Sequence, residues 1–323
     1  MSNFDLEKKC EVCESPIPDD YGNMLCTECY VRADEAKKQK EYAKEHEVNV
    51  EVKVDVKTEI TEAQTKTEPT FSGISDPNYQ ENPEAPDKEQ VSTNVELFKK
   101  NGVMLWKPTR TMYSFVRDHC RKRGMSHIQY PKYVWLPKVV DVGCGCGVGS
   151  NAISEAADFV WGIDKNELSA RFAKECFTRT KNNFYYHPQV TFDHLDVMLD
   201  TREYMKFDVV VAIEIIEHIY DARGFVQRLI KNFAKKNKNG QWDLESPTEF
   251  FISSPNRNNK SIRKDRPANV FHVREWKSGE LYKLLSDYFN QIEIFNSAGV
   301  PIPKEEYETT LHTPLLFKTW HPK

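Results

Sequence analysis

Three glycines at alternate positions follow a short apolar segment and form the clearest chemical signal in the chain. Residues 139–142 read Val-Val-Asp-Val, and Gly143, Gly145 and Gly147 come directly after them. An apolar segment of this kind is typical of a buried parallel strand. Glycines at its end allow a tight turn with no Cβ in the way, so a ligand can lie against the main chain. The pattern predicts a ligand-binding turn between this strand and a helix that opens near Ser150.

Acidic residues follow the next two predicted strands, where they would meet a ligand bound at the glycine turn. Asp164 ends the apolar segment at 159–163 and stands 21 residues after Gly143. A carboxylate at this place can accept hydrogen bonds from both hydroxyls of a ribose, whereas its structural alternative is to cap the following helix. Asp193 and Asp196 come at the end of the third predicted strand, and either can also serve as a turn residue.

Two glutamates and a histidine follow a fourth apolar segment at 207–213. Glu214, Glu217 and His218 occupy positions i, i+3 and i+4, so in a helix all three side chains project from one face. His272 follows later in the chain. An imidazole has a pKa near neutrality, so His218 or His272 can act as a general base. These four residues are the candidate catalytic residues.

The combination of motifs resembles class I S-adenosylmethionine-dependent methyltransferases over roughly residues 135–290. Asp-x-Gly-x-Gly-x-Gly at 141–147 resembles their first motif. Glu-x-x-Glu-His at 214–218, Ser-Pro-Asn at 254–256 and His-x-x-Glu-Trp at 272–276 occur together in two groups of that class. One group contains the O-methyltransferases of ubiquinone biosynthesis and related glycan or small-molecule enzymes. The other contains the small-RNA 3′-terminal 2′-O-methyltransferases. The resemblance implies an enzyme with a Rossmann-like, doubly wound α/β fold whose sheet is mostly parallel.

This resemblance implies that S-adenosylmethionine is the cofactor. It assigns ribose binding to Asp164 and the contact with the adenine amine to Asp196, with Asp193 as the alternative. The residues expected to bind the cofactor are Asp141, Gly143, Gly145, Gly147, Asp164, Asp196 and Glu214. Cys144 and Cys146 lie within the glycine turn and are expected to fill space, since the sequence places no base beside them to activate a nucleophile.

The resemblance to the small-RNA group also implies a metal site. In that group two glutamates and two histidines hold magnesium, and the matching positions here are Glu214, Glu217, His218 and His272. A divalent ion can lower the pKa of an attacking hydroxyl and orient it toward the methyl sulfonium. Magnesium prefers oxygen ligands, so a site with two histidines also suits manganese. The alternative is a metal-independent enzyme in which Glu214 lines the cofactor pocket and His218 packs or forms a hydrogen bond.

Basic residues cluster at three places and predict an anionic acceptor. The first cluster follows a predicted strand end and consists of Arg257, Lys260, Arg263, Lys264 and Arg266. Because this cluster precedes His272, we expect it to overhang the acceptor and bind phosphate, as in nucleic acid. An ordinary solvated loop is the alternative. The other clusters are Arg117, Arg121, Lys122 and Arg123, and Lys231, Lys235, Lys236 and Lys238.

Oxygen is the expected target atom by elimination. The chain shows neither an Asn-Pro-Pro-Tyr-type element for exocyclic amines near the fourth predicted strand nor a Pro-Cys nucleophile for cytosine C5. The preferred function is therefore an O-directed methyltransferase for a phosphate-bearing acceptor such as nucleic acid. The alternatives are a small-molecule or glycan O-methyltransferase, and a protein that binds S-adenosylmethionine without catalysis.

A cysteine-rich unit at residues 1–30 precedes the predicted enzyme domain. Its four cysteines form two Cys-x-x-Cys pairs, Cys10 with Cys13 and Cys26 with Cys29. Two such pairs can hold one tetrahedral zinc ion, which would supply the folding energy that so short a chain lacks, and the unit resembles a zinc ribbon. Residues 31–95 are charged and poor in large apolar side chains toward their end, which predicts a largely disordered linker. Residues 96–323 form the predicted methyltransferase domain.

Charge and hydropathy narrow the class of protein. Residues 1–100 carry 13 Lys and Arg against 23 Asp and Glu, whereas the rest of the chain carries 32 against 26. The acidic first part and mildly basic remainder are compatible with an anionic substrate. The chain shows no secretory signal and no apolar run near the length of a membrane span. We therefore expect a cytoplasmic protein whose eight cysteines are thiols or metal ligands.

The elements that must position these residues alternate between strands and helices. Strands are predicted at 138–142, 159–163, 189–193, 207–213, 249–253 and 290–295. Helices are predicted at 150–157, 166–180, 221–236 and 278–288, with one or two more within 95–135. This alternation is typical of a parallel sheet wrapped by helices.

Overall fold

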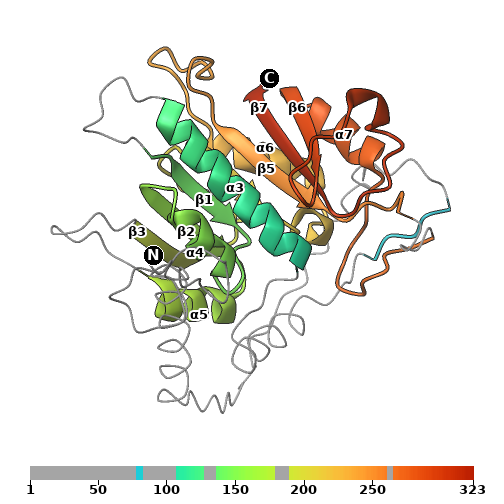
Figure 1. Cartoon of the computed structure of the whole chain (residues 1–323). Coiled ribbons are helices and arrows are strands. Elements are labelled where there is room, and N and C mark those ends of the chain that lie inside the picture. Colours follow the sequence, from blue (N-terminus) through green and yellow to red (C-terminus); the bar gives the residue numbers. More distant parts are fainter. Residues whose placement is uncertain (1–77, 83–106, 127–135, 179–188, 260–264) are drawn as a thin grey trace, which may run out of the picture. The chain divides into compact units, whose positions relative to one another are not determined.

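The computed structural model describes residues 78–82, 107–126, 136–178, 189–259 and 265–323 (Figure 1). The zinc unit predicted at 1–30 lies outside these ranges, and so does most of the linker predicted at 31–95. Among the helices of the described ranges, none has the length and apolar character needed to cross a membrane.

Seven strands form one mostly parallel sheet in the order β3-β2-β1-β4-β5-β7-β6. The strands are β1 (Lys138–Val142), β2 (Phe159–Asp164), β3 (Gln189–His194), β4 (Val209–Ala212), β5 (Glu249–Ser254), β6 (Phe289–Asn296) and β7 (Leu315–Pro322). Strands β1 to β5 pair in parallel, and β7 is antiparallel to both β5 and β6. This topology confirms the predicted doubly wound, Rossmann-like fold. Since β1 is flanked by β2 and β4, the switch point lies at the carboxyl ends of β1 and β4, where such sheets bind ligands.

Strand β7 is the one strand of the described sheet that the sequence analysis missed. The other six lie where they were predicted, with bounds that differ by at most two residues. β7 ends in Lys-Thr-Trp-His-Pro, which breaks the apolar pattern of a buried strand. Its place between β5 and β6 comes from pairing with strands that precede it in the chain, which a local pattern does not report.

The described helices are α3 (Lys107–Ser126), α4 (Val148–Ser154), α5 (Glu167–Phe177), α6 (Ala222–Phe233) and α7 (Ser278–Ser286), with two 3₁₀ turns, η1 (Ile216–His218) and η2 (Lys304–Glu306). Helix α5 begins where the Asn166 side chain accepts a hydrogen bond from the Ser169 N–H, and α6 where Asp221 accepts from the Gly224 N–H. Such caps satisfy N–H groups that have no partner within the helix. Helix α3 crosses one face of the sheet in front of β1 (Figure 1).

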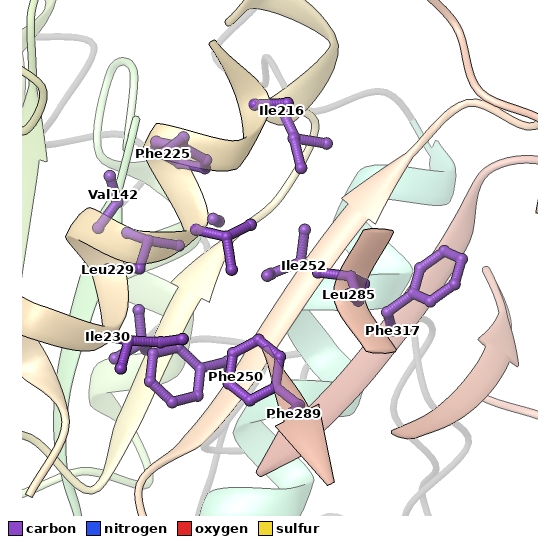
Figure 2. Close-up of a cluster of buried hydrophobic side chains, with 14 of the residues drawn as sticks. Val142, Ile216, Phe225, Leu229, Ile230, Phe250, Ile252, Leu285, Phe289 and Phe317 are labelled. Atoms are coloured by element: carbon purple, nitrogen blue, oxygen red, sulfur yellow. The ribbon is translucent and has the colours of Figure 1, made fainter. Parts of the chain in front are cut away.

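The hydrophobic core joins α6 and α7 to the sheet. Figure 2 shows Phe225 and Leu229 of α6, Ile252 of β5, Leu285 of α7 and Phe317 of β7 packed in one cluster. All five side chains are at most 1% exposed. Burial of each such side chain stabilises the fold by roughly 1.5–3 kcal/mol, which holds the strand ends rigidly enough to carry a site.

Residues 78–82 fall inside the range predicted as linker, yet they pack against the domain. Tyr79 is buried. The Gln80 N–H donates to the Asp265 carbonyl at 2.7 Å, and the Asn82 N–H donates to the Val273 carbonyl at 2.8 Å. These five residues are therefore an ordered part of the structure, and the two backbone hydrogen bonds join residues 185 and 191 positions apart in the chain.

Candidate active site

A cavity of about 870 Å³ opens at the switch point of the sheet. Its volume is near the upper end of the roughly 300–1,000 Å³ of ligand pockets, so it has room for a cofactor and the reacting end of a second molecule. The predicted site residues that line it are Gly143, Gly145, Asp164, Asp196, Glu214, Glu217, His218 and His272. Tertiary structure thus brings together eight residues that the sequence spreads over 130 positions.

The glycine turn presents bare backbone to this cavity. Gly145 has φ +54° and nothing within 4 Å of the position that a Cβ would occupy. Gly147 has φ +80°, but a Cβ there would lie 2.7 Å from the Ala173 side chain and 2.8 Å from that of Phe192. Gly147 does not line the cavity. Gly145 therefore faces the cavity, whereas Gly147 allows close packing beneath the turn.

Cys144 and Cys146 line the same turn and are both buried. Burial raises the pKa of the Cys144 thiol well above its usual value and that of Cys146 to about 12. The two thiols therefore stay neutral, as expected of residues that fill space.

Asp141 supports the turn from within the protein and does not line the cavity. It is fully buried. Its Oδ1 accepts from the Tyr113 hydroxyl at 3.2 Å, and its Oδ2 accepts from the Ser150 hydroxyl at 2.6 Å. Burial raises its pKa to about 7, while the two hydrogen bonds act in the opposite direction. Asp141 thereby ties β1 to α3 and α4. Of Asp141, Tyr113 and Ser150, Tyr113 alone lines the cavity.

Asp164 holds the glycine turn while it faces the cavity. Its two oxygens accept hydrogen bonds from the Gly145 N–H and the Asn166 N–H, each at 2.8 Å. The alternative role as a helix cap is wrong, because Asn166 provides the side-chain cap of α5. Each carboxylate oxygen has a second lone pair, so Asp164 can also accept from ribose hydroxyls.

The structure separates the two candidates for the adenine contact. Asp196 lines the cavity, and its Oδ1 also accepts from the Met198 N–H at 2.8 Å. Asp193 is exposed and accepts from the Trp161 indole N–H at 2.8 Å, away from the cavity lining. Asp196 is therefore both a turn residue and the better-placed ligand contact.

Glu214 adopts a left-handed backbone conformation at the end of β4, with φ +56°. Left-handed φ costs a non-glycine residue of order 1–3 kcal/mol and is found at functional sites. Ser253 offsets this cost, because its hydroxyl accepts from the Glu214 N–H at 2.8 Å and donates to Glu214 Oε1 at 2.7 Å. Burial raises the pKa of Glu214 to about 7, and the Ser253 hydrogen bond opposes it.

Glu217, His218 and His272 converge on one point of the cavity. One possible ligand atom from each lies within 4.8 Å of the others. The spacing of Glu214, Glu217 and His218 would place all three on one face only if the whole segment were helical, and it is not. Only Ile216–His218 are helical, as a single 3₁₀ turn, and Glu214 lies outside this three-residue cluster.

The Glu217 carboxylate lacks partners within the described part of the chain. It is fully buried, and neither oxygen accepts a hydrogen bond there. Burial and the neighbouring Glu214 carboxylate raise its pKa well above the ordinary range. A buried carboxylate without donors is costly, and a divalent cation beside two imidazoles would satisfy it. One carboxylate and two imidazoles form a donor set that could hold a divalent ion and suits Mn²⁺ better than Mg²⁺, but Glu214, the fourth ligand that the resemblance implied, is not part of the cluster.

Hydrogen bonds orient both histidine rings. His218 Nδ1 is 2.8 Å from the Phe271 carbonyl, which can only accept, so Nδ1 carries the proton and Nε2 the lone pair. His272 Nδ1 is 2.7 Å from Glu275 Oε1, and its Nε2 is 3.1 Å from the Asn269 amide nitrogen. Glu275 thus fixes the tautomer of His272, a role that the sequence analysis missed although the His-x-x-Glu spacing was visible.

The predicted phosphate-binding loop is partly wrong. Arg257 is fully buried, and its guanidinium donates to Glu280 Oε1 at 3.1 Å. It therefore does not reach an acceptor. Arg266 is exposed beside Asp265, and the remaining three cations of that loop, Lys260, Arg263 and Lys264, lie outside the described residues.

The second and third basic clusters are mostly occupied by protein partners. Arg117 and Arg121 both contact Asp118, and Arg123 pairs with Glu249. In the third cluster, the Lys235 ammonium lies 2.7 Å from Asp208, and that of Lys236 lies over the Trp242 ring. Exposed or satisfied ion pairs of this kind stabilise local structure weakly and leave little charge for a distant anion.

Comparison with known proteins agrees with the geometry. Residues 137–285 match the family model described as "Methyltransferase domain". A probable S-adenosylmethionine-dependent methyltransferase of Mycolicibacterium smegmatis is 28% identical over 50% of this chain and 56% of its own length. A ubiquinone biosynthesis O-methyltransferase of Coxiella burnetii is 32% identical over 38% of this chain and 45% of its own length. The chain thus spans about half the length of these relatives.

A solved methyltransferase structure is also similar to part of this chain. The plantazolicin methyltransferase BpumL, solved in complex with SAH, aligns with a TM-score of 0.47 at 14% identity. The alignment covers 74% of this chain and 92% of that one. Residues 137–285 are therefore similar to a methyltransferase domain, and the Mycolicibacterium relative is named a probable S-adenosylmethionine-dependent methyltransferase.

Proposed function

We propose that the chain transfers a methyl group from S-adenosylmethionine to a hydroxyl oxygen of its acceptor. One observation carries the proposal: the glycine turn and the Glu217, His218 and His272 cluster face the same cavity. The turn supplies a place for the methyl donor, and the cluster supplies groups that can take a proton from a hydroxyl. A base matters most for hydroxyl acceptors, because the sulfonium already activates the methyl group.

On the donor side, Asp164 and Asp196 would bind the ribose and the adenine amine. Gly145 would let the rest of the cofactor lie against the main chain. Asp164 already accepts two backbone N–H groups, so its position is set before the ligand arrives. Such preorganisation lowers the entropic cost of aligning donor and acceptor in line.

On the acceptor side, an imidazole nitrogen would take the hydroxyl proton as the new oxygen–carbon bond forms and the carbon–sulfur bond breaks. S-adenosylhomocysteine is then the second product. His218 and His272 each hold their Nδ1 against an acceptor, which directs the lone pair to Nε2. In the alternative, Glu217, His218 and His272 would hold Mg²⁺ or Mn²⁺, which when bound lowers the pKa of the acceptor hydroxyl; the imidazoles are then metal ligands and not the base.

The charge of the cavity bears on the acceptor class. Its described lining contains five carboxyl side chains, Asp164, Asp196, Glu214, Glu217 and Glu275, and one lysine, Lys165. A lining with a single lysine offers few cationic partners to a phosphate, so it favours an acceptor that is uncharged around its reacting hydroxyl. This favours the small-molecule or glycan alternative over the phosphate-bearing acceptor, such as nucleic acid, that the basic clusters first suggested.

Methyl transfer from labelled S-adenosylmethionine into a fractionated cell extract, with and without Mg²⁺ or Mn²⁺, tests the proposal. We expect label in the small-molecule or glycan fraction, with the new bond stable to conditions that cleave carboxyl esters. Label in nuclease-sensitive material, with a steep dependence on salt, would instead establish a nucleic-acid acceptor. Cofactor binding without label in any fraction would favour the non-catalytic alternative.

A further inference from the structure

Residues 78–82 form a strap across the segment that carries His272. They contact it through both backbone and side chains. Beyond the two backbone bonds described above, the Asn82 amide donates to the Val270 carbonyl at 2.9 Å, and the Glu275 N–H donates to the Tyr79 hydroxyl oxygen at 2.7 Å. Several contacts in so few residues indicate a specific fit between two segments far apart in the chain.

Glu81 neutralises Arg274, a buried arginine that joins the segment carrying His272 to the segment carrying His218. Arg274 is 1% exposed, and its Nε and Nη2 donate to the two Glu81 oxygens at 2.8 and 3.2 Å. Its Nη1 donates to the Ile219 carbonyl at 3.0 Å. Because an unpaired buried charge is costly, loss of Glu81 would force Arg274 to move. Such a move would release Ile219, the residue that follows His218.

Backbone bonds continue this connection to Glu217. The Val273 and Arg274 N–H groups both donate to the Glu217 carbonyl, at 2.9 and 3.2 Å. The segment that the strap holds is therefore the same segment that fixes the 3₁₀ turn of Glu217 and His218.

Tyr79 supports the other end of this segment. Its hydroxyl accepts from the N–H of Glu275, whose side chain orients His272. Its ring lies 4.0 Å from the Arg257 guanidinium carbon, a cation–π contact with a buried cation. Burial raises the pKa of Tyr79 above its usual value, so the phenol stays neutral.

We propose that Tyr79 and Glu81 are positioning residues for the Glu217, His218 and His272 cluster. The proposal rests on the function proposed above. The strap lies outside residues 137–285, which match the methyltransferase family model, so the functional unit of this chain would begin at about residue 78 and not at 96. The strap would act on the acceptor side alone, because its contacts are with the segments that carry the cluster.

The test compares Tyr79→Phe and Glu81→Gln with Gln80→Ala in the full-length chain. The Gln80 side chain is exposed and lies between the two positioning residues, so it provides a matched control. Mn²⁺ affinity is measured by electron paramagnetic resonance, and S-adenosylmethionine affinity by calorimetry. We expect both variants to weaken Mn²⁺ binding by about 10- to 100-fold, the usual effect of outer-sphere partners. Cofactor affinity should stay unchanged, and Gln80→Ala should match the wild type in both measurements.

Hydrogen–deuterium exchange provides a readout that needs neither metal nor acceptor. We expect faster exchange at residues 214–219 and 265–276 in both variants, with no change at 139–150. Unchanged exchange at 214–219 together with unchanged Mn²⁺ affinity would overturn the proposal. So would an equal loss of Mn²⁺ and cofactor affinity, since that indicates general destabilisation. If Glu81→Gln fails to fold, Tyr79→Phe, which keeps the ring, decides the outcome.

The same experiment separates this inference from the proposed function. A wild-type chain that binds no S-adenosylmethionine would refute the function, while the exchange data would still report whether the strap holds residues 214–219. If the wild-type chain binds the cofactor and neither Tyr79→Phe nor Glu81→Gln changes Mn²⁺ affinity or hydrogen exchange, the strap proposal alone is refuted.

Discussion

Asp164→Asn tests the cofactor side of the site most directly. The Asp164 oxygens accept the Gly145 and Asn166 N–H groups at 2.8 Å each, and the side chain also lines the cavity. Asparagine keeps the size of the side chain but replaces one acceptor oxygen with an NH₂ donor. One backbone N–H then faces a donor, and the ribose loses a charged acceptor.

The expected loss of affinity follows from these contacts. A hydrogen bond to a charged group contributes roughly 1.5–3 kcal/mol, which corresponds to about a 10- to 150-fold rise in the dissociation constant. The mismatch with the backbone N–H destabilises the cofactor-free and cofactor-bound protein alike. It therefore lowers the stability of the fold more than the affinity for S-adenosylmethionine. We therefore expect weaker binding of S-adenosylmethionine within this range and a modest fall in the melting temperature.

Calorimetric titration of the full-length chain with S-adenosylmethionine measures the effect, with Asp193→Asn as the matched control. Asp193 is exposed and outside the cavity lining, so the same substitution there should change affinity by less than about twofold. Unchanged affinity in Asp164→Asn would refute the ribose assignment. An equal loss in Asp193→Asn would refute the argument that the cavity marks the cofactor site.

Three further predictions address the buried acid, the cluster and the cysteine unit. The folded-state pKa of Asp141 is raised from 3.8 to about 7, so the folded protein binds this proton more tightly and loses stability as pH rises through that window. The free energy of unfolding of the wild type should therefore fall between pH 5 and pH 8, and Asp141→Asn should remove about 2–3 kcal/mol of that fall, measured by urea unfolding at both pH values. The same pH dependence in wild type and variant would contradict the burial argument. His272→Ala should abolish methyl transfer into the extract while calorimetry shows unchanged cofactor affinity, and a fully active variant would exclude His272 as base or metal ligand. Elemental analysis should find one zinc per chain, and its retention in Cys10→Ser would exclude the proposed four-cysteine site.

Local patterns in the sequence were sufficient for every strand of the described sheet except β7, and for the glycine turn and Asp164 that line the cavity. Buried parallel strands are continuous apolar runs, so β1 and β4 could be read from consecutive residues. The glycine turn and Asp164 follow their strands directly, and the carboxyl ends of neighbouring parallel strands meet at one edge. For these elements, order along the chain is sufficient to determine position in space.

The basic clusters show where prediction from neighbouring residues in the sequence failed. Arg257 belongs to a basic run in the sequence, but its side chain is neutralised by Glu280, 23 residues later, and covered by Tyr79. A count of cations along the chain does not report which of them are paired in the fold. Arg257 is therefore not available to bind phosphate as predicted, because contacts formed only in the folded chain occupy it.

The sequence by itself determined the class of fold and supplied the candidate residues for both sides of the site. The tertiary structure decided which of those candidates meet, separating Glu214 from the cluster of Glu217 and the two histidines. It also decided what holds that cluster, since Glu81 and Arg274 are 193 residues apart in the chain. The physical reason is that short-range periodicity encodes strands and turns, whereas the pairing of buried charges depends on chain segments brought together only by folding.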